Sequence, residues 1–333
     1  MAKRKAKKMQ PAVTRLWFHI NSENTTNYID LSLAASAANR RFYRQGLSWA
    51  VAGMTLHTVG DTDSEGDLLT VNGNFDVSKI PETWMAANAH TMVKNIWMKS
   101  QDQVLDDQPS IAAKYRDFKI YLDENMVGAT RQGVGSNPAT DGEILMPIDR
   151  RNLTALPGEW AYSTIQLPNA GGSSAPTEVN LHMVGEDVTS GTQSRGLIHG
   201  YALARSRLQL VDPNTPSDTG WITQVFDVAD NLDAIRQDVT DNNDLPPYRV
   251  GDTQTGLTDE YYPGGQNNQP NTQLHSVEFI SGTTVGGKTH VNGGIFPCGL
   301  IRFDWDIKQA AESMFLSVDL VPGTHKGYLA EAY

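Results

Sequence analysis

The chain has very little cysteine: Cys298 is the single thiol among 333 residues. One thiol cannot form a disulfide within the chain, so no disulfide framework stabilises the fold, and folding in a reducing compartment fits this composition. No apolar run approaches the roughly 18 residues of a membrane-spanning helix. The charged N-terminal stretch is followed by no apolar segment, so we expect neither a signal peptide nor a membrane span.

Sequence motifs that carry catalysis are also missing. GxSxG, HExxH, CxxC and GxxxxGK[ST] do not occur, and the eight histidines are scattered singly along the chain. His57, His182 and His290 alternate with apolar neighbours, which is typical of strand positions rather than metal ligands. Cys298 has no base beside it in the sequence, as expected of a buried structural thiol. We therefore expect no enzymatic activity and no cofactor.

Charge is distributed unevenly along a chain whose formal net charge is -11. Residues 1–44 hold nine basic side chains against two acidic ones, whereas residues 212–260 hold eleven acidic side chains against two basic ones. Such polarity gives a protein one basic and one acidic face, which is useful where the inside and the outside of an assembly differ.

Residues 1–12 predict a flexible basic arm, with five cations at positions 3–8: Lys3, Arg4, Lys5, Lys7 and Lys8. Cations at this density neutralise phosphates without reading base sequence, which indicates nucleic-acid binding. The run is equally typical of a solubilising or localisation tail. Its charge is small for a packaged genome, so Arg40, Arg41 and Arg44 are candidates to add to it. Three bases at a helix end also fit a solvated helix terminus.

Aromatic residues interleave with these bases in the first fifth of the chain. Nucleobases stack on such rings in single-stranded recognition, and Tyr43, between Phe42 and Arg44, is the candidate for this role. Trp17 and Trp49 are expected to pack in the core instead.

One acidic turn resembles the start of a calcium-binding loop. Asp61, Asp63 and Glu65 alternate, with Gly66 in sixth position. An EF-hand needs an acidic twelfth residue, where Asn72 stands, and flanking helices, where strands are predicted. An ordinary acidic hairpin turn is the other interpretation of this segment.

The pattern along the chain predicts a mainly β fold, an antiparallel jelly-roll β-sandwich with long loops and two or three short helices, filling residues 13–333. Strands are predicted at 14–20, 28–33, 48–59, 67–77, 117–122, 159–167, 177–184, 275–281, 299–306 and 314–321. Helices are predicted at 32–44, 81–103 and 223–238, and residues 196–208 fit a strand or a helix. Gly286-Gly287 and Asn292-Gly293-Gly294 predict turns.

Several segments in order along the chain resemble capsid proteins of small circular single-stranded DNA viruses known from environmental sequences. They are NRRFYRQG at 39–46, which follows YIDLSLAASA, RGLIHGYALARSR at 195–207, residues 210–213, residues 262–265, and VDLVPGTHKGYL at 318–329. The resemblance implies a jelly-roll capsid fold, a closed icosahedral shell and no enzymatic activity. The arm departs from the long, arginine-dense arms of better-known circular-virus coats.

We therefore expect a viral coat protein that self-assembles into an icosahedral shell around a nucleic-acid genome, single-stranded DNA by the resemblance. Its location is then the virion, assembled inside the host cell. The alternative is a carbohydrate- or receptor-binding β-sandwich module, of phage-tail or secreted lectin type, with Trp160, Tyr261 and Tyr262 at a sugar site. A hydrolase on a β-scaffold is disfavoured because no acid, base or metal set clusters in the sequence.

Overall fold

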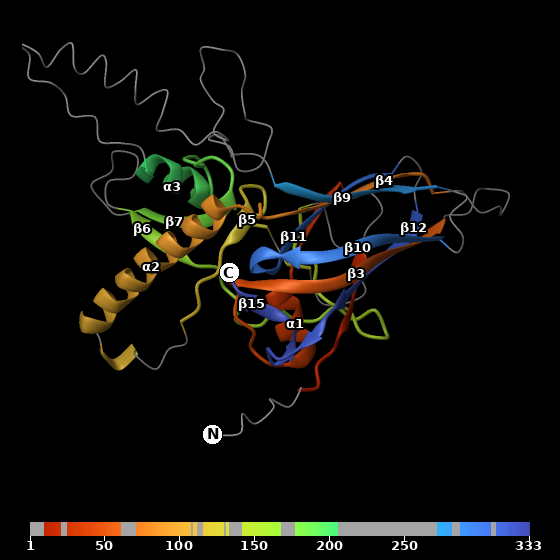
Figure 1. The fold of residues 1–333 in the computed structure, drawn as a ribbon, viewed down its shortest axis with the longest axis horizontal. Coiled ribbons are helices and arrows are strands. Elements are labelled where there is room, and N and C mark those ends of the chain that lie inside the picture. The colour runs from red at the N-terminus through yellow and green to blue at the C-terminus, as the bar shows by residue number, and fades with distance from the viewer. Residues whose placement is uncertain are drawn as a thin grey trace, which may run out of the picture.

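The computed structural model describes residues 10–20, 25–60, 71–107, 109–111, 116–129, 131–132, 142–167, 177–205, 272–281, 287–307 and 311–333. This part of the chain is mainly β, with antiparallel sheets that curl into a half-barrel, so the predicted fold class is confirmed at this level. Two sheets pack face to face, and a second lobe of helices and short strands lies beside them (Figure 1).

Each of the two packed sheets has four strands along its hydrogen-bonded path. The first sheet runs in the order β1 (Arg15–Ile20), β12 (Ala311–Leu320), β3 (Leu47–Gly60) and β10 (Lys288–Phe296), and β15 (Ala330–Ala332) also pairs with β3. The second sheet runs in the order β2 (Thr26–Asp30), β11 (Leu300–Ile307), β4 (Gly73–Lys79) and β9 (Gln273–Ile280). A two-stranded ribbon, β13 (Pro322–Gly323) with β14 (Gly327–Tyr328), lies near the C-terminus.

The antiparallel pairs of these eight strands are nested. In chain order the first strand pairs with the last (β1 with β12), and the second with the seventh (β2 with β11). The third pairs with the sixth (β3 with β10), and the fourth with the fifth (β4 with β9). One long hairpin folded back on itself has this pairing. In this protein two of the four pairs lie in the first sheet and two in the second.

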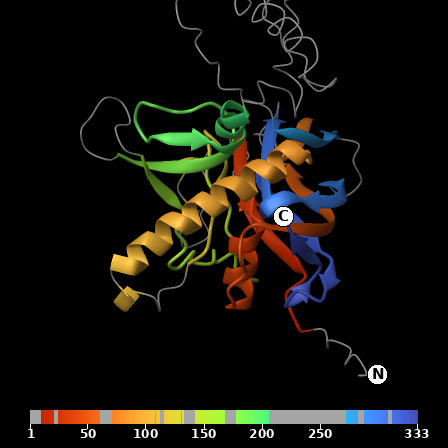
Figure 2. The ribbon, with the colours of Figure 1, turned by 60° about the vertical axis from the view of Figure 1, so that its left-hand side comes forward.

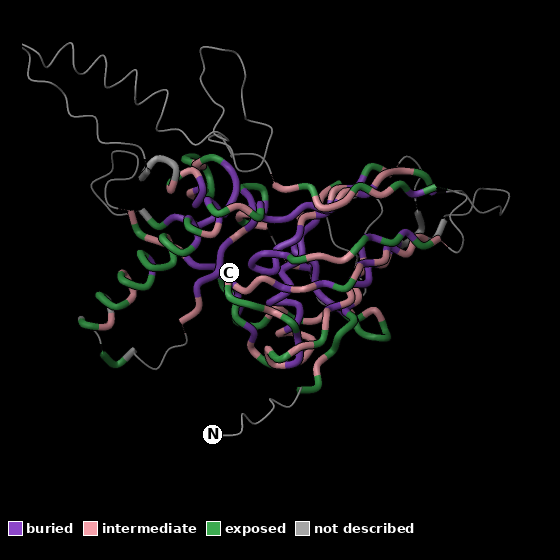
Figure 3. Tube along the Cα trace, viewed as in Figure 1, coloured by how far each residue is buried: buried purple, intermediate pink, exposed green. Residues whose placement is uncertain are grey.

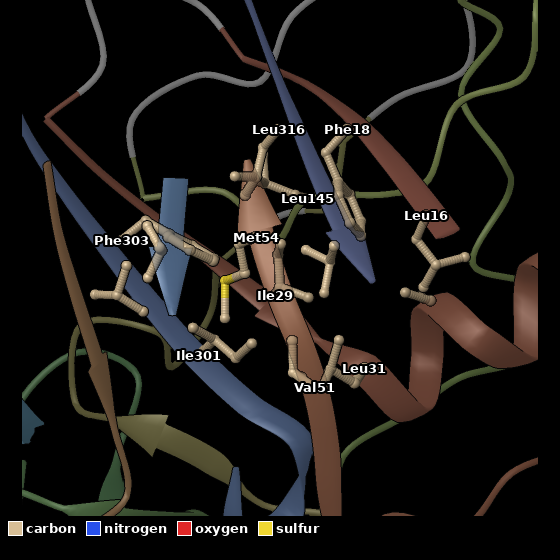
Figure 4. Packing of buried hydrophobic residues seen from close by; sticks show 14 of the residues in the cluster. Leu16, Phe18, Ile29, Leu31, Val51, Met54, Leu145, Ile301, Phe303 and Leu316 are labelled. Carbon is tan, nitrogen blue, oxygen red and sulfur yellow. The ribbon is translucent and has the colours of Figure 1, made fainter. Parts of the chain in front are cut away.

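The core between the two sheets follows from residue alternation. On β1, Leu16, Phe18 and Ile20 are buried, and the residues between them face outward. Because successive side chains in a strand point to opposite faces, one side of each strand supplies the core. Figure 4 shows this packing, with Met54 of β3 lying between side chains of both sheets. Each fully buried leucine or phenylalanine contributes about 1.5–3 kcal/mol.

Most of the described residues between β4 and β9 form the second lobe, whereas the stretch 143–148 hydrogen-bonds to β1 and β2 of the two sheets. The elements of the lobe are α2 (Trp84–Asp107), η1 (Pro109–Ile111), β5 (Tyr121–Asp123), β6 (Thr164–Leu167), β7 (Thr177–Val184), β8 (Ser194–Gly196) and α3 (Leu197–Arg205). The sheet of this lobe is mixed, because β5 and β8 are both parallel to β7. Helix α2 crosses beside this small sheet (Figure 2). A second buried core lies here, away from the sandwich interior (Figure 3).

Helix boundaries differ from the predicted ones for local reasons. The helix predicted at 32–44 is α1 (Leu31–Asn39), because Asp30 caps it earlier and Arg40 ends it in the left-handed region, at φ 50°. The helix predicted at 81–103 is confirmed as α2, although it begins at Trp84 and ends at Asp107; with 24 residues it is longer than the short helices expected of the fold class. Its first half packs on the second core through Met85, Ala86 and Ala89, whereas its second half is largely exposed. Residues 197–205 are helical, and the helix predicted at 223–238 lies outside the described residues.

The turn predicted at Asn292-Gly293-Gly294 is wrong, because these residues lie inside β10. The two glycines make the sequence of this strand look like that of a turn. A Cβ at Gly293 would collide with the carbonyl oxygens of Val51 and Ala52 on the neighbouring strand. Glycine is therefore required here for close approach of two strands rather than for a turn. The short bridge η5 (Pro297–Gly299) then leads from β10 into β11.

Candidate nucleic-acid interface

Helix α1 determines where the predicted basic cluster lies. Asp30 ends β2, and its Oδ1 accepts hydrogen bonds from the backbone N–H groups of Ser32 and Leu33, at 2.9 and 3.2 Å. This cap satisfies two of the N–H groups that a helix start leaves free. The helix ends after Asn39, and Arg40 and Arg41 follow it directly, so both arginines are carried at its C-terminal end.

Arg40 and Arg41 border a groove of about 1340 Å³ between α1 and the segment 147–160. Apolar side chains line it, including Leu33, Phe42 and Leu156. The groove also contains charges of both signs, because Lys119, Asp149 and Glu159 line it as well. Backbone N–H groups of Leu153 and Arg151 lower the pKa of Asp149, so this carboxylate remains ionised at neutral pH. The groove therefore combines an apolar floor with Arg40 and Arg41 at its border and charges of both signs along its lining.

The three arginines of the predicted triplet are not equivalent. The Arg41 guanidinium donates to Gln10 Oε1 at 2.7 Å and to the Lys326 carbonyl at 3.4 Å. Arg41 therefore contacts Gln10, the first described residue of the predicted arm. Arg40 makes no hydrogen bond or ion pair to any described residue, which leaves its charge available. Arg44 is exposed but does not line the groove, and it acts instead on the carboxylate of Asp117.

Tyr43 is not available for base stacking, so that prediction is wrong. Its side chain is 0 % exposed and belongs to the sandwich core, and its hydroxyl donates to the Lys326 carbonyl at 3.0 Å. Burial raises the pKa of this phenol. Tyr43 points inward because its ring packs between Trp49 and Tyr328, and the expected burial of Trp49 is confirmed. The prediction that Trp17 packs in the core is wrong, because Trp17 lies on the outward side of β1, between the buried Leu16 and Phe18.

The aromatic pair at the groove is Phe42 and Trp160, whose ring centroids lie 5.6 Å apart. The Lys119 ammonium lies 4.8 Å from the Trp160 centroid and 5.5 Å from that of Phe42, in cation–π geometry. Trp160 is 6 % exposed, so it offers little free ring face to a sugar, contrary to the alternative that placed it at a carbohydrate site. Sequence patterns gave no signal for this trio, because its members are brought together only by tertiary contacts.

The other predicted site residues lie outside the described residues. These are the arm cations Lys3, Arg4, Lys5, Lys7 and Lys8, the acidic turn with Asp61, Asp63 and Glu65, and the loop tyrosines Tyr261 and Tyr262. Among the residues that the structure describes, no three histidine, cysteine, aspartate or glutamate side chains are grouped to hold a metal ion. Within the same residues, no helix is long and apolar enough to cross a membrane.

Cys298 is a buried structural thiol, as its sequence context indicates. It is 0 % exposed, and burial raises its pKa well above the usual range, which keeps it protonated and unreactive. Comparisons with protein-family models, curated proteins and solved structures give no match to this chain.

Proposed function

We propose that the two packed sheets form a jelly roll, in which the lobe between β4 and β9 is an insertion. The nested strand pairing carries this proposal. A jelly roll has eight antiparallel strands in two sheets with Greek-key connections. Wrapping one long hairpin of four strand pairs produces the order first–eighth–third–sixth in one sheet and second–seventh–fourth–fifth in the other. The two sheets of this protein follow that order.

On this fold we infer that the protein is a viral coat subunit, which self-assembles into an icosahedral shell around a genome of single-stranded DNA. Jelly rolls also occur in lectins and cupins, so the fold alone does not decide the function. Two features support a shell. The basic arm joins the folded domain beside Arg41 at the edge of the groove, and apolar side chains are exposed on the outer strands. The virion, assembled inside the host cell, is then the protein's location.

The exposed apolar side chains lie where the two sheets have their outer strands. Phe279 of β9 is 77 % exposed, Leu274 of the same strand 55 %, and Ile295 of β10 55 %. β9 and β10 are edge strands, and edges of this kind promote pairing with another chain unless a protein protects them. An exposed apolar edge is a liability in a monomer but a ready contact in a subunit that assembles.

Size-exclusion chromatography followed by electron microscopy of the full-length protein tests this function. Closed particles of uniform size are expected, and a stable monomer at high concentration rejects the proposal. Phe279→Asp is expected to reduce particle yield by placing a charge at a subunit contact. Ile96→Asp changes another exposed apolar residue, 43 % exposed on α2 and outside the groove, and serves as the matched control. Equal yields from both variants would remove the β9 edge from the assembly.

A further inference from the structure

The outward face of the first sheet carries aromatic rings where a solvent-facing surface is ordinarily polar. On β1, Trp17 and His19 alternate with the buried core positions and point to this face. Across the sheet, Trp17 is in register with Ser317, and Ser317 with Thr55. In the next outward row, His19 is in register with Phe315, and Phe315 with His57.

These rings form two contacting pairs, which together make a ring floor on this face. The rings of His19 and Phe315 are stacked, with centroids 4.7 Å apart and planes within 12°. The indole of Trp17 lies 5.0 Å from the His57 ring, although strand β12 runs between their backbones. The indole therefore lies over Ser317, in agreement with the 3 % exposure of that serine.

A cavity of about 520 Å³ lies between this floor and a tight turn. Trp17, His57 and Phe315 line one side, and Asp149, Arg150 and Asn152 line the other. The turn is held in place by hydrogen bonds. Asp149 Oδ1 accepts from the N–H groups of Arg151 and Leu153 at 2.8 and 2.9 Å, and Ile148 N–H donates to the Trp17 carbonyl at 2.8 Å. The cavity is therefore bounded by two fixed elements.

Charges of both signs border the cavity, from Arg150 and Asp149. Arg150 is exposed and makes no hydrogen bond or ion pair to any described residue. Lys288 and His290 lie close enough to His57 to lower its pKa, in addition to the larger effect of burial. The Asp149 carboxylate keeps its negative charge, and its Oδ1 is held by the backbone N–H groups of Arg151 and Leu153. Aromatic rings with a free guanidinium beside them suit a ligand that has a flat, uncharged ring next to an anionic group.

We propose that this cavity binds a nucleobase of a single-stranded nucleic acid, with the base stacked on the ring floor and the adjacent phosphate on Arg150. The assignment rests on the proposed function, because a packaged single-stranded genome supplies this ligand. The basic arm reinforces it: Lys8 lies nine residues before Trp17, so the two are at most about 30 Å apart along the chain. An uncharged sugar also stacks on aromatic rings, but it makes no use of the cationic edge.

Binding of fluorescein-labelled oligothymidylate to the full-length protein, followed by fluorescence polarisation, tests the site. Trp17→Ala is expected to weaken binding about 5- to 150-fold, the range for loss of one stacked base, and Trp17→Phe to retain most of it. Trp84→Ala, which removes a 42 % exposed indole on α2, is the matched control and is expected to have no effect. Equal affinity for wild type and Trp17→Ala overturns the proposal. Oligouridylate in the same assay distinguishes a DNA-specific site from one that accepts either nucleic acid.

Arg150→Ala provides a second test that does not disturb the sheet. This exposed side chain is expected to contribute one phosphate contact, so its loss weakens binding and lowers the slope of log affinity against log salt by about 0.7. Lys99→Ala, an exposed cation on α2, is the charge-matched control. An unchanged salt slope in Arg150→Ala contradicts the phosphate contact.

Photocrosslinking locates the bound base directly. An oligonucleotide that contains 5-bromouracil is expected to label Trp17 in the tryptic peptide from Leu16 to Arg40. Binding without labelling of Trp17, His57 or Phe315 overturns the site, as does saturable binding of a neutral oligosaccharide that competes with the oligonucleotide. Electron microscopy of the same preparation keeps the two proposals separate: particles without base labelling reject only the cavity, and base labelling without particles rejects only the shell.

Discussion

Arg302 on β11 and Asp123 on β5 form an ion pair between the sandwich and the inserted lobe, with 2.9 Å between Nη1 and Oδ2. The Asp123 side chain is 6 % exposed, and the Tyr28 hydroxyl donates a second hydrogen bond to the same oxygen. The Arg302 guanidinium also contacts both carboxylate oxygens of Asp304. One arginine therefore links the inserted lobe to the second sheet.

Arg302→Leu is expected to destabilise the protein by about 3 kcal/mol, because it leaves the buried Asp123 carboxylate without its charge partner. Urea unfolding measures the loss. Arg116→Leu breaks an ion pair with Asp102 whose side chains are 31 % and 62 % exposed, so a loss below about 1 kcal/mol is expected. Similar losses in both variants would contradict the special role of the Arg302 pair.

Stability is expected to depend on the ionisation of Asp30. Burial raises the pKa of this carboxyl to about 6, although hydrogen bonds from Leu33, Gln45 and Tyr162 act in the opposite direction. The folded protein then takes up a proton at higher pH than the unfolded chain, whose carboxyl titrates near 3.8. The contribution of Asp30 to stability is therefore largest near pH 4 and is lost as pH rises through about 6.

Asp30→Asn removes this titration and keeps a side chain that caps helices well. The free energy of unfolding of wild type relative to the variant is expected to fall between pH 4 and pH 6 and to be constant above that range. Urea unfolding at a series of pH values measures the difference, in which the contributions of other groups cancel. A difference that does not change with pH would show that the pKa of Asp30 is the same in the folded and unfolded protein.

Substitution of alanine for two different glycines is expected to change the stability of the protein in opposite directions. Gly293→Ala places a methyl group against the carbonyl oxygens of Val51 and Ala52 and is expected to destabilise the fold by about 1–3 kcal/mol. Gly200 lies in α3 with open space around it, so Gly200→Ala is expected to stabilise by about 0.5–1 kcal/mol. Thermal unfolding of both variants tests the pair, and stabilisation by Gly293→Ala would refute the close approach of β3 and β10.

Replacing the five arm cations Lys3, Arg4, Lys5, Lys7 and Lys8 by glutamine tests the contribution of the arm. Affinity for single-stranded nucleic acid is expected to fall, with a salt slope smaller by up to about 3.5, because each cation releases about 0.7 counterions. Substitution keeps the chain length, so it changes charge alone. An unchanged slope would remove the arm from nucleic-acid binding and leave the solubilising tail as its interpretation.

Much of the sandwich was predictable from local pattern. Alternation of apolar and polar residues predicts most of its strands, including β1, β3, β11 and β12, because a half-buried strand repeats every two residues. The pattern failed at β10, where Gly293 and Gly294 indicate a turn, and at Tyr43, where neighbouring bases suggest an exposed ring. In both places the deciding contact comes from a segment far away in the sequence: strand β3 for Gly293, and the turn at Lys326 for Tyr43.

Local sequence patterns were enough to predict the mainly β class, most strand and helix positions and the basic character of the N-terminus, because each depends on residues close together in the chain. Tertiary structure alone decided the nested pairing, which joins Arg15 to Asp319 across 304 positions. It also separated Arg40 and Arg41 from Arg44, and it placed Trp17 against His57. The residue pattern of a strand reveals which of its faces is buried but not which strand lies beside it. Candidate sites built from several strands depend on which strands are neighbours, so they could not be predicted from the pattern.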